Sequence, residues 1–297
     1  MKDSMVIAIA GPTASGKASL AIEIAKHVQG EVISVDSRQV YKDLNIGTEK
    51  VTPEEMRDIP HHMIDIVDPE ETYTVERFQK EARACINEIK SRNNIPILAG
   101  GSGQYMDAVL YETNFPQVPP NKELRKDLED VPTAALFKVL EDQDPERAKT
   151  IDPYNKQRLI RALEIVDALG SVPAQTEQEP LFTMKYFGIE VSKEELQTRI
   201  TKRLEETLHK GLIDEVREIR ARLGDTRINE LGLEYRIVRD YLDGKIKEAD
   251  LQAELLTELM RYAKRQLTWF KRNKDIIWLP RDEVLVEATR SSASTRV

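Results

Sequence analysis

The chain has 297 residues, enough for one α/β domain with an insertion, and an ordinary globular composition of 40% hydrophobic and 32% charged residues. Its single cysteine, Cys85, excludes an internal disulfide framework, and no apolar run approaches the ~20 residues that span a bilayer. Residues 1–4 lead directly into an apolar segment, which favours a cytoplasmic protein without a signal peptide, and the net charge of −8 argues only weakly against a polyanionic partner.

A phosphate-binding loop is predicted near the N-terminus. Residues 5–10 form an apolar run suited to a buried strand, and a helix is predicted over residues 17–29. Between them, Gly11, Gly16 and Lys17 have the spacing of a loop whose backbone N–H groups and lysine hold a di- or triphosphate. Ala18 stands where such loops carry Ser or Thr, so the usual hydroxyl ligand for magnesium is missing.

A second strand is predicted over residues 31–35, and Asp36 follows at its carboxyl end. Open α/β sheets place their ligands at this edge. A carboxylate close to a phosphate loop is compatible with a magnesium ligand, a general base or a helix cap, and position alone does not separate these roles.

The next segments indicate a second glycine turn. A helix with an apolar stripe that includes Cys85 is predicted over residues 72–93, and a buried strand over residues 95–99. Glycines surround Ser102 directly after this strand, which suggests another close approach of backbone to a ligand.

The adjacent His61 and His62 point to opposite sides of an extended chain, so local hydrogen bonds are a better explanation for them than a metal site.

From about residue 113 the composition changes, and residues 115–184 are predicted to form a mostly helical insertion. Arg158 and Arg161 are three residues apart on one predicted helix face. Such a pair suits either phosphate capture or surface ion pairs, and both interpretations stay open.

The chain then returns to the core, with a strand over residues 185–191 and helices over 194–223 interrupted at Gly211. Residues Arg199, Lys202 and Arg203 share a basic face there. A long helix over residues 251–271 ends in a basic run, residues 261–274, which is compatible with nucleic-acid binding or with a solvated helix face. We expect a frayed tail from Ala288.

Six separated motifs carry a family resemblance: GPTASGK, DSRQVY, HHMIDIVDP, GGSGQY, RALE and KRQLTWF. Their order and separations closely resemble the bacterial tRNA dimethylallyltransferase (IPP transferase) family. The resemblance implies an α/β fold with a P-loop NTPase-like core, residues 1–114 and 185–297, whose parallel sheet is flanked by helices. It further implies that the insertion binds the anticodon stem-loop of tRNA, that dimethylallyl diphosphate is the donor, and that Mg²⁺ is the cofactor. We expect a monomer.

The resemblance also implies residue roles. The base accepting a proton from the adenine N6 amine would be Asp36, and Lys17 and Ser102 would complete the catalytic set. Diphosphate would be held by Gly11, Pro12, Thr13, Ala14, Ser15, Gly16, Lys17 and Ala18. Contacts to tRNA would come from Asp36, Ser37, Arg38, Gln39, Ser102, Arg125, Gln157, Arg158, Leu159, Ile160 and Arg161.

Three other functions are compatible with parts of this pattern. The phosphate loop alone fits a nucleotide or small-molecule kinase, which would transfer phosphate from ATP. A related prenyltransferase would act on free adenine nucleotides and would lack a helical insertion of this kind. The substitution at Ala18 also permits an RNA-binding protein that has lost turnover.

Overall fold

The computed structural model describes residues 5–113, 115–174 and 179–290. The chain divides into two compact units, Met1–Tyr111 with Pro180–Val297, and Glu112–Glu179. The smaller unit begins and ends a few residues before the predicted 115–184, and Met184, which the prediction assigned to the insertion, is the first residue of a core strand. The chain enters and leaves the smaller unit side by side, because Tyr111 forms an antiparallel bridge with Pro180.

Six parallel strands form the centre of the larger unit, in the order β3-β2-β4-β1-β5-β6. The strands are β1 (Val6–Ala10), β2 (Gly30–Val35), β3 (His61–His62), β4 (Ile95–Gly100), β5 (Met184–Ile189) and β6 (Ile277–Leu279). All five residues of β1 are buried, as expected for a central parallel strand whose two faces are both covered.

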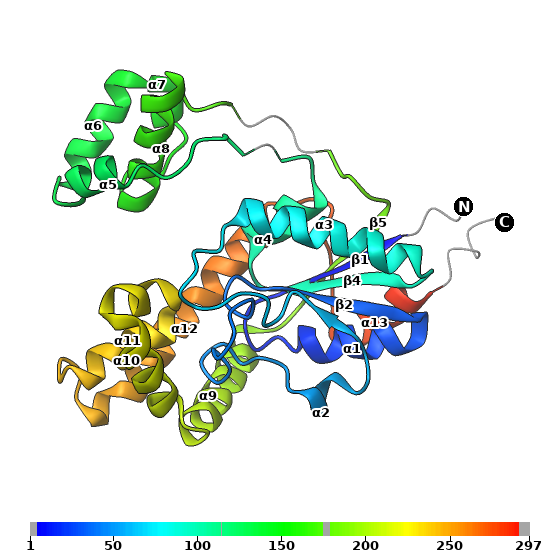
Figure 1. The fold of residues 1–297 in the computed structure, drawn as a ribbon. Coiled ribbons are helices and arrows are strands. Elements are labelled where there is room, and N and C mark those ends of the chain that lie inside the picture. The colour runs from blue at the N-terminus through cyan, green and yellow to red at the C-terminus, as the bar shows by residue number, and fades with distance from the viewer. Residues whose placement is uncertain (1–4, 114, 175–178, 291–297) are drawn as a thin grey trace. The chain divides into compact units, whose positions relative to one another are not determined.

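Helices cover both faces of this sheet, as Figure 1 shows. Successive side chains of a strand point to opposite faces. Accordingly Val6 and Ala8 pack in the core under α3 (Val75–Ser91) and α4 (Gly103–Leu110). Ile7 and Ile9 pack in the core under α1 (Lys17–Val28) and α13 (Arg281–Thr289). Together with the parallel sheet, this arrangement confirms the predicted α/β class.

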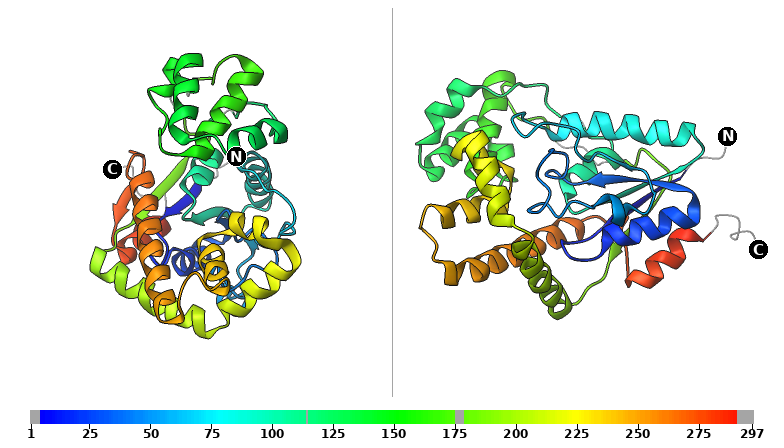
Figure 2. Two further views of the ribbon diagram at one scale, coloured as in Figure 1. Left: turned by 90° about the vertical axis from the view of Figure 1, so that its left-hand side faces the viewer. Right: turned by 60° about the horizontal axis from the view of Figure 1, so that its bottom comes forward.

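Further helices gather beyond the carboxyl ends of the strands (Figures 1 and 2). They are α9 (Lys193–His209), α10 (Leu212–Leu231), α11 (Leu233–Leu242) and α12 (Glu248–Phe270), while the short α2 (Pro53–Met56) precedes β3. Gly211 separates α9 from α10 with φ 102°, a left-handed conformation that favours glycine, so the predicted interruption is confirmed. None of the described helices is long and apolar enough to cross a membrane.

The smaller unit is helical, as predicted. It contains α5 (Lys122–Glu129), α6 (Thr133–Gln143), α7 (Pro145–Ala148) and α8 (Lys156–Leu169). Leu136 and Leu140 from α6 pack against Leu159 and Leu163 from α8. The unit therefore has a hydrophobic core of its own.

One expectation about the C-terminal region was wrong. The tail was expected to fray from Ala288, but Ala288 is a buried residue of α13, where it packs with Val284 in the core that also contains α1 residues. The buried residues of α13, Val284 and Ala288, are four positions apart. A single such pair is too little to reveal a helical period in the sequence. Residues 291–297 lie outside the described part of the chain.

The local hydrogen bonding predicted for His61 and His62 is confirmed. Nδ1 of His61 bonds to the carbonyl of Ile59 at 2.8 Å, and Nε2 of His62 lies 2.7 Å from Oε2 of Glu31. The Glu31 carboxylate, on β2, is buried and also accepts hydrogen bonds from Arg92 and Asn94. These bonds, that from Arg92 above all, lower the pKa of Glu31 to about 2.

Replacing Glu31 by Gln is expected to destabilise the larger unit by about 3 kcal/mol at pH 7, because Arg92 loses its buried counter-charge. Because the folded pKa lies below the ordinary value, the stabilisation is present at neutral pH and is lost as the pH falls from about 4.5 towards 2. Urea unfolding at pH 7 and pH 3 measures both effects. Glu146→Gln, which removes an exposed ion pair, is the control. Equal losses of stability in the two variants would contradict the stabilising role of the buried Glu31 carboxylate.

Candidate active site

The predicted phosphate loop connects β1 to α1. Gly16 is the N-cap residue of α1 and has φ 84°, and Ala14 has φ 63°, so two residues of the loop adopt left-handed conformations. These turns wrap the backbone around the start of α1, where free N–H groups and the helix dipole favour an anion. Nζ of Lys17 folds back to donate to the carbonyl of Pro12 at 3.1 Å. The loop is therefore built as the sequence predicted.

The side chain of Lys17 is half-buried near the charged groups of Arg203, Asp36 and Glu49. Burial lowers its pKa to about 8, with a further contribution from Arg203, against the opposing effects of Asp36 and Glu49. A partly desolvated ammonium gains when an anion binds beside it. The position of Lys17 thus favours a diphosphate or a similar ligand.

Two arginines of α9 reach the same loop. Nη1 of Arg199 donates to the carbonyl of Ser15 at 3.1 Å, and Nη2 of Arg203 donates to the hydroxyl of Thr13. Arg203 also forms an ion pair with Glu49. The spacing of four residues puts both guanidinium groups on one helix face, so the basic face noted in the sequence is part of the site.

Asp36 forms a tight turn at the end of β2. Its Oδ1 accepts hydrogen bonds from the backbone N–H groups of Arg38 at 2.8 Å and Gln39 at 3.3 Å. No helix begins at Asp36, so the helix-cap role considered from the sequence is not realised, and the carboxylate holds a turn instead. The second carboxylate oxygen does not take part in these two bonds, so holding the turn and accepting a proton are compatible in one side chain.

The second glycine turn lies beside this segment. Oγ of Ser102 accepts a hydrogen bond from the backbone N–H of Ser37 at 3.1 Å, which ties the turn after β4 to the turn after β2. The side chain of Gln39 is used internally, since it accepts from Ser34 and donates to the carbonyls of Thr48 and Glu49. Gln39 thus orders the 48–49 turn, although the sequence suggested contact with tRNA.

A cavity of about 310 Å³ brings these parts together. Thr13 of the phosphate loop and the carboxylate-bearing Asp36 both line it, together with Ser37 and Arg38. The lining is completed by Glu49, the junction of α10 and α11, and two α12 residues, Tyr262 and Arg265. The guanidinium of Arg265 lies 5.8 Å from the centre of the Tyr262 ring.

Two glutamates of this cavity, Glu49 and Glu234, have raised pKa values. Burial raises the pKa of Glu234 to about 7, and burial also raises the pKa of Glu49 against the opposing charges of Arg203 and Lys17. Clustered perturbed groups in a cavity are typical of functional sites. The raised pKa values mark Glu49 and Glu234 as part of the candidate site.

The residues present do not form a site for Mg²⁺. Ala18 has no hydroxyl, and Oγ of Ser19 donates to the carbonyl of Gly16 at 2.9 Å instead of facing the loop. In the described part of the chain, no three His, Cys, Asp or Glu side chains are grouped as a metal site.

The helical unit arranges two of the predicted tRNA-contacting arginines around one buried carboxylate. Arg125 donates to Glu164 through Nε at 2.6 Å and Nη2 at 2.8 Å, and Arg161 donates at 3.1 Å. The Glu164 side chain is fully buried. Ion pairing, one of the two roles left open from the sequence, is therefore realised for Arg161, whereas Arg158 and Gln157 are exposed.

Two predicted contacts need correction. Leu159 and Ile160 lie on the inner face of α8, and their side chains are buried in the core of the helical unit. Their alternation with exposed residues follows the helical period rather than a binding motif. These two side chains are structural in this arrangement.

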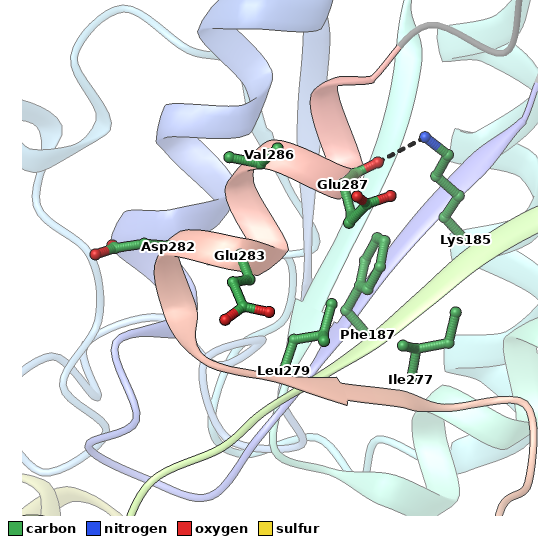
Figure 3. Close-up of a pocket in the computed structure, with 8 residues that line it drawn as sticks. All are labelled: Lys185, Phe187, Ile277, Leu279, Asp282, Glu283, Val286 and Glu287. Carbon is green, nitrogen blue, oxygen red and sulfur yellow. Dashed lines mark hydrogen bonds between the residues drawn. The ribbon is translucent and has the colours of Figure 1, made fainter. Parts of the chain in front are cut away.

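A larger cavity, about 600 Å³, lies at the β6 edge of the sheet and is unrelated to the phosphate loop (Figure 3). Its walls are apolar residues of β5, β6 and α13 together with Asp282, Glu283 and Glu287. The one lysine that lines it, Lys185, points towards the end of α13 and donates to the carbonyl of Glu287 at 2.7 Å. Three carboxylates and a lysine that already has a partner make this cavity unsuited to a diphosphate.

Comparison with known proteins identifies a family for this chain. The family model described as IPP transferase matches residues 39–273. The chain belongs to the IPP transferase family. A curated relative named tRNA dimethylallyltransferase, from Shouchella clausii, is 39% identical, and the match covers 95% of this chain and 93% of the relative.

Solved structures of IPP transferase relatives have the same fold. A crystal structure of a tRNA isopentenylpyrophosphate transferase from Bacillus halodurans has a TM-score of 0.73 at 36% identity, covering 96% of this chain and 94% of that one. A eukaryotic dimethylallyltransferase described as acting on tRNA has a TM-score of 0.78 at 26% identity, covering 94% of this chain and 74% of that one. The resemblance inferred from the six motifs is thus confirmed at the level of the family.

Several residues of the cavity were not singled out from the sequence. Glu49, Glu234 and Tyr262 carry no local motif, because each comes from a different segment and only tertiary packing brings it to Asp36. A signal did exist for Arg199 and Arg203, whose basic face had been noted. The sequence alone does not reveal which loop this helix face contacts, so the two arginines could not be assigned to the phosphate loop.

Proposed function

We propose that this IPP transferase moves a dimethylallyl group from dimethylallyl diphosphate to N6 of adenosine 37 in tRNA, releasing diphosphate. The observation that carries the proposal is the cavity lined by both Thr13 of the phosphate loop and Asp36. Curated relatives covering almost the whole chain are named tRNA dimethylallyltransferase, which supports the same reaction.

The diphosphate end of the donor would occupy the phosphate loop. Backbone N–H groups at the start of α1 and the charged groups of Lys17, Arg199 and Arg203 surround that place. Negative charge grows on the diphosphate as its bond to the allylic carbon breaks. Preorganised cations stabilise this leaving group more in the transition state than in the ground state.

The acceptor amine would lie beside Asp36. The N6 nitrogen forms a bond to the allylic carbon while the carbon–oxygen bond to diphosphate breaks, and the amine proton passes to the carboxylate oxygen that is not held by the turn. A base stacked inside an anticodon loop is out of reach, so the adenosine has to leave the stack to enter the cavity.

The helical unit is proposed to bind the anticodon stem-loop. Arg125, Arg158 and Arg161 supply guanidinium groups suited to phosphate oxygens, and the ion pairs with Glu164 hold two of them in fixed positions. The protein is proposed to act as a monomer, because the expected substrate requires no symmetric partner.

The reaction is tested by following label from dimethylallyl diphosphate into an anticodon stem-loop with adenosine at position 37, beside the same RNA with guanosine there. Transfer to the adenosine RNA alone supports the proposal. Binding of both RNAs without transfer would favour the RNA-binding alternative, and transfer to free adenine nucleotides would favour the other prenyltransferase. Phosphate transfer from ATP would point to the kinase.

Adding the missing hydroxyl tests the metal requirement. The wild-type protein is expected to depend weakly on Mg²⁺, because Ala18 offers no ligand, and Ala18→Thr is expected to lower the Mg²⁺ concentration for half-maximal transfer by about tenfold, the effect of one further oxygen ligand worth about 1.4 kcal/mol. A Mg²⁺ titration of single-turnover transfer measures this. Ala18→Val, which has the shape of threonine without the hydroxyl, is the control, and identical titration curves for all three proteins would refute the expectation.

A further inference from the structure

The buried side chain of Gln266 joins two turns that follow neighbouring strands. Oε1 accepts the backbone N–H of Thr13 at 2.8 Å, and Nε2 donates to the carbonyl of Gly101 at 3.0 Å. Thr13 belongs to the phosphate loop after β1, and Gly101 to the turn after β4. Gln266 itself is on α12 and is only 6% exposed, so these hydrogen bonds are protected from water.

The fit between Gln266 and the second turn is close. A Cβ atom at Gly101 would lie 2.2 Å from Nε2 of Gln266, so the amide can reach the carbonyl only because residue 101 is glycine. Both ends of the amide have partners, one as acceptor and one as donor. The contact is therefore a bridge that matches both turns, not a side chain that fills space.

Each bridged turn carries a group of the proposed reaction. The Thr13 hydroxyl accepts from Arg203, and the next residue after Gly101 is Ser102, which holds the backbone of Ser37 at 3.1 Å. Asp36 directly precedes Ser37. A single side chain thus links the diphosphate loop to the turn that holds the segment after β2.

We propose that Gln266 is a positioning residue that holds the diphosphate loop and the Ser102 turn at the spacing required for prenyl transfer. The inference rests on the proposed function, because it assigns the two turns to donor and acceptor. Positioning errors of about 1 Å can cost about 10²-fold in rate. An amide is required, since a carboxylate would accept from Thr13 but would set a second oxygen against the carbonyl of Gly101.

The test compares Gln266→Leu and Gln266→Glu with the same substitutions at Gln252, an exposed residue of the same helix. For each protein, kcat, KM for dimethylallyl diphosphate, Kd for inorganic diphosphate, Kd for the stem-loop and the thermal midpoint are measured. Gln266→Leu is expected to raise Kd for diphosphate about tenfold and to lower kcat about tenfold or more. Its Kd for RNA should stay within about twofold of wild type, and the Gln252 variants should match wild type throughout.

Gln266→Glu adds a second measurement, the pH dependence of diphosphate affinity. A merely structural role would not change this dependence. The Kd of Gln266→Glu for diphosphate, taken relative to wild type at each pH, should recover as the pH falls from 8 to 6. Protonation restores a donor for Gly101 and removes the negative charge near the ligand. This variant has nearly the shape of glutamine, so it remains informative if Gln266→Leu does not fold.

Two results would overturn the inference. One is a lower thermal midpoint in both Gln266 variants with kcat and diphosphate affinity unchanged in the folded protein. The other is an equal loss of RNA and diphosphate affinity, which would indicate a general disturbance. If the wild-type protein transfers no label, the proposed function fails, and the affinity for inorganic diphosphate alone then decides whether Gln266 positions the loop.

Discussion

Asp36→Asn is expected to lower kcat for prenyl transfer by about 10²–10⁴-fold with little change in stability. Asparagine retains the oxygen that accepts the N–H groups of Arg38 and Gln39, so the turn at the end of β2 is preserved. It removes the anionic oxygen that would take the proton from the N6 amine. A single-turnover assay with saturating RNA and donor measures the chemical step, and thermal unfolding checks the fold.

The matched control for this substitution is Asp152→Asn in the helical unit. Asp152 likewise accepts the backbone N–H of the residue two positions on, Tyr154, at 3.0 Å, but it belongs to no cavity with the phosphate loop. Its variant should turn over as wild type does. Unchanged turnover of Asp36→Asn would remove Asp36 from the role of base.

Lys17→Met is expected to weaken binding of dimethylallyl diphosphate about 100-fold at pH 7, corresponding to about 2.7 kcal/mol for a lost charge-assisted contact. In the wild type, the affinity should also depend on pH. The pKa of Lys17 without ligand is about 8, so the ammonium is charged below that pH and has to be reprotonated on binding above it. Affinity should therefore fall by up to tenfold per unit as the pH rises past 8.

Lys17→Arg separates charge from shape in that experiment. Guanidinium stays protonated through the whole range. The affinity of Lys17→Arg for dimethylallyl diphosphate should be lower than that of wild type at pH 7. It should stay nearly constant between pH 7 and 9.5 after correction for the ionisation of the ligand. Calorimetric titrations at several pH values measure all three proteins. A parallel decline in wild type and Lys17→Arg would show that another group titrates.

Local signals explain which parts of the fold could be predicted from sequence. The phosphate loop could be predicted because its glycine spacing, the strand before it and the helix after it all lie in one continuous segment, residues 5–29. Alternation and apolar runs identified β2, β4 and β5 to within about two residues. Short elements such as α13 and β6 have too few residues for a period, so they became visible only through packing.

The candidate site was predicted less completely than the fold. Asp36 and Ser102 follow strands, and the common edge of a parallel sheet brings them together without further information. The contacts of Arg203, Glu49 and Gln266 depend on where α9 and α12 cross the loop, and nothing in one sequence fixes that geometry. At Leu159 and Ile160 the sequence predicted too many contacts. The segment assigned to RNA binding also contains these two buried residues, which hold its helix in place.

The side-by-side entry and exit of the helical unit has an evolutionary consequence. Tyr111 bridges to Pro180, and the backbone N–H of Glu112 donates to the carbonyl of Glu179 at 3.0 Å, so the chain departs from and rejoins the sheet-containing unit at one point. An ancestor with a short hairpin there could have acquired the helices as a cassette in one genetic event. Strand order and register on either side would have been left untouched, so the helical unit can vary without disturbing the sheet.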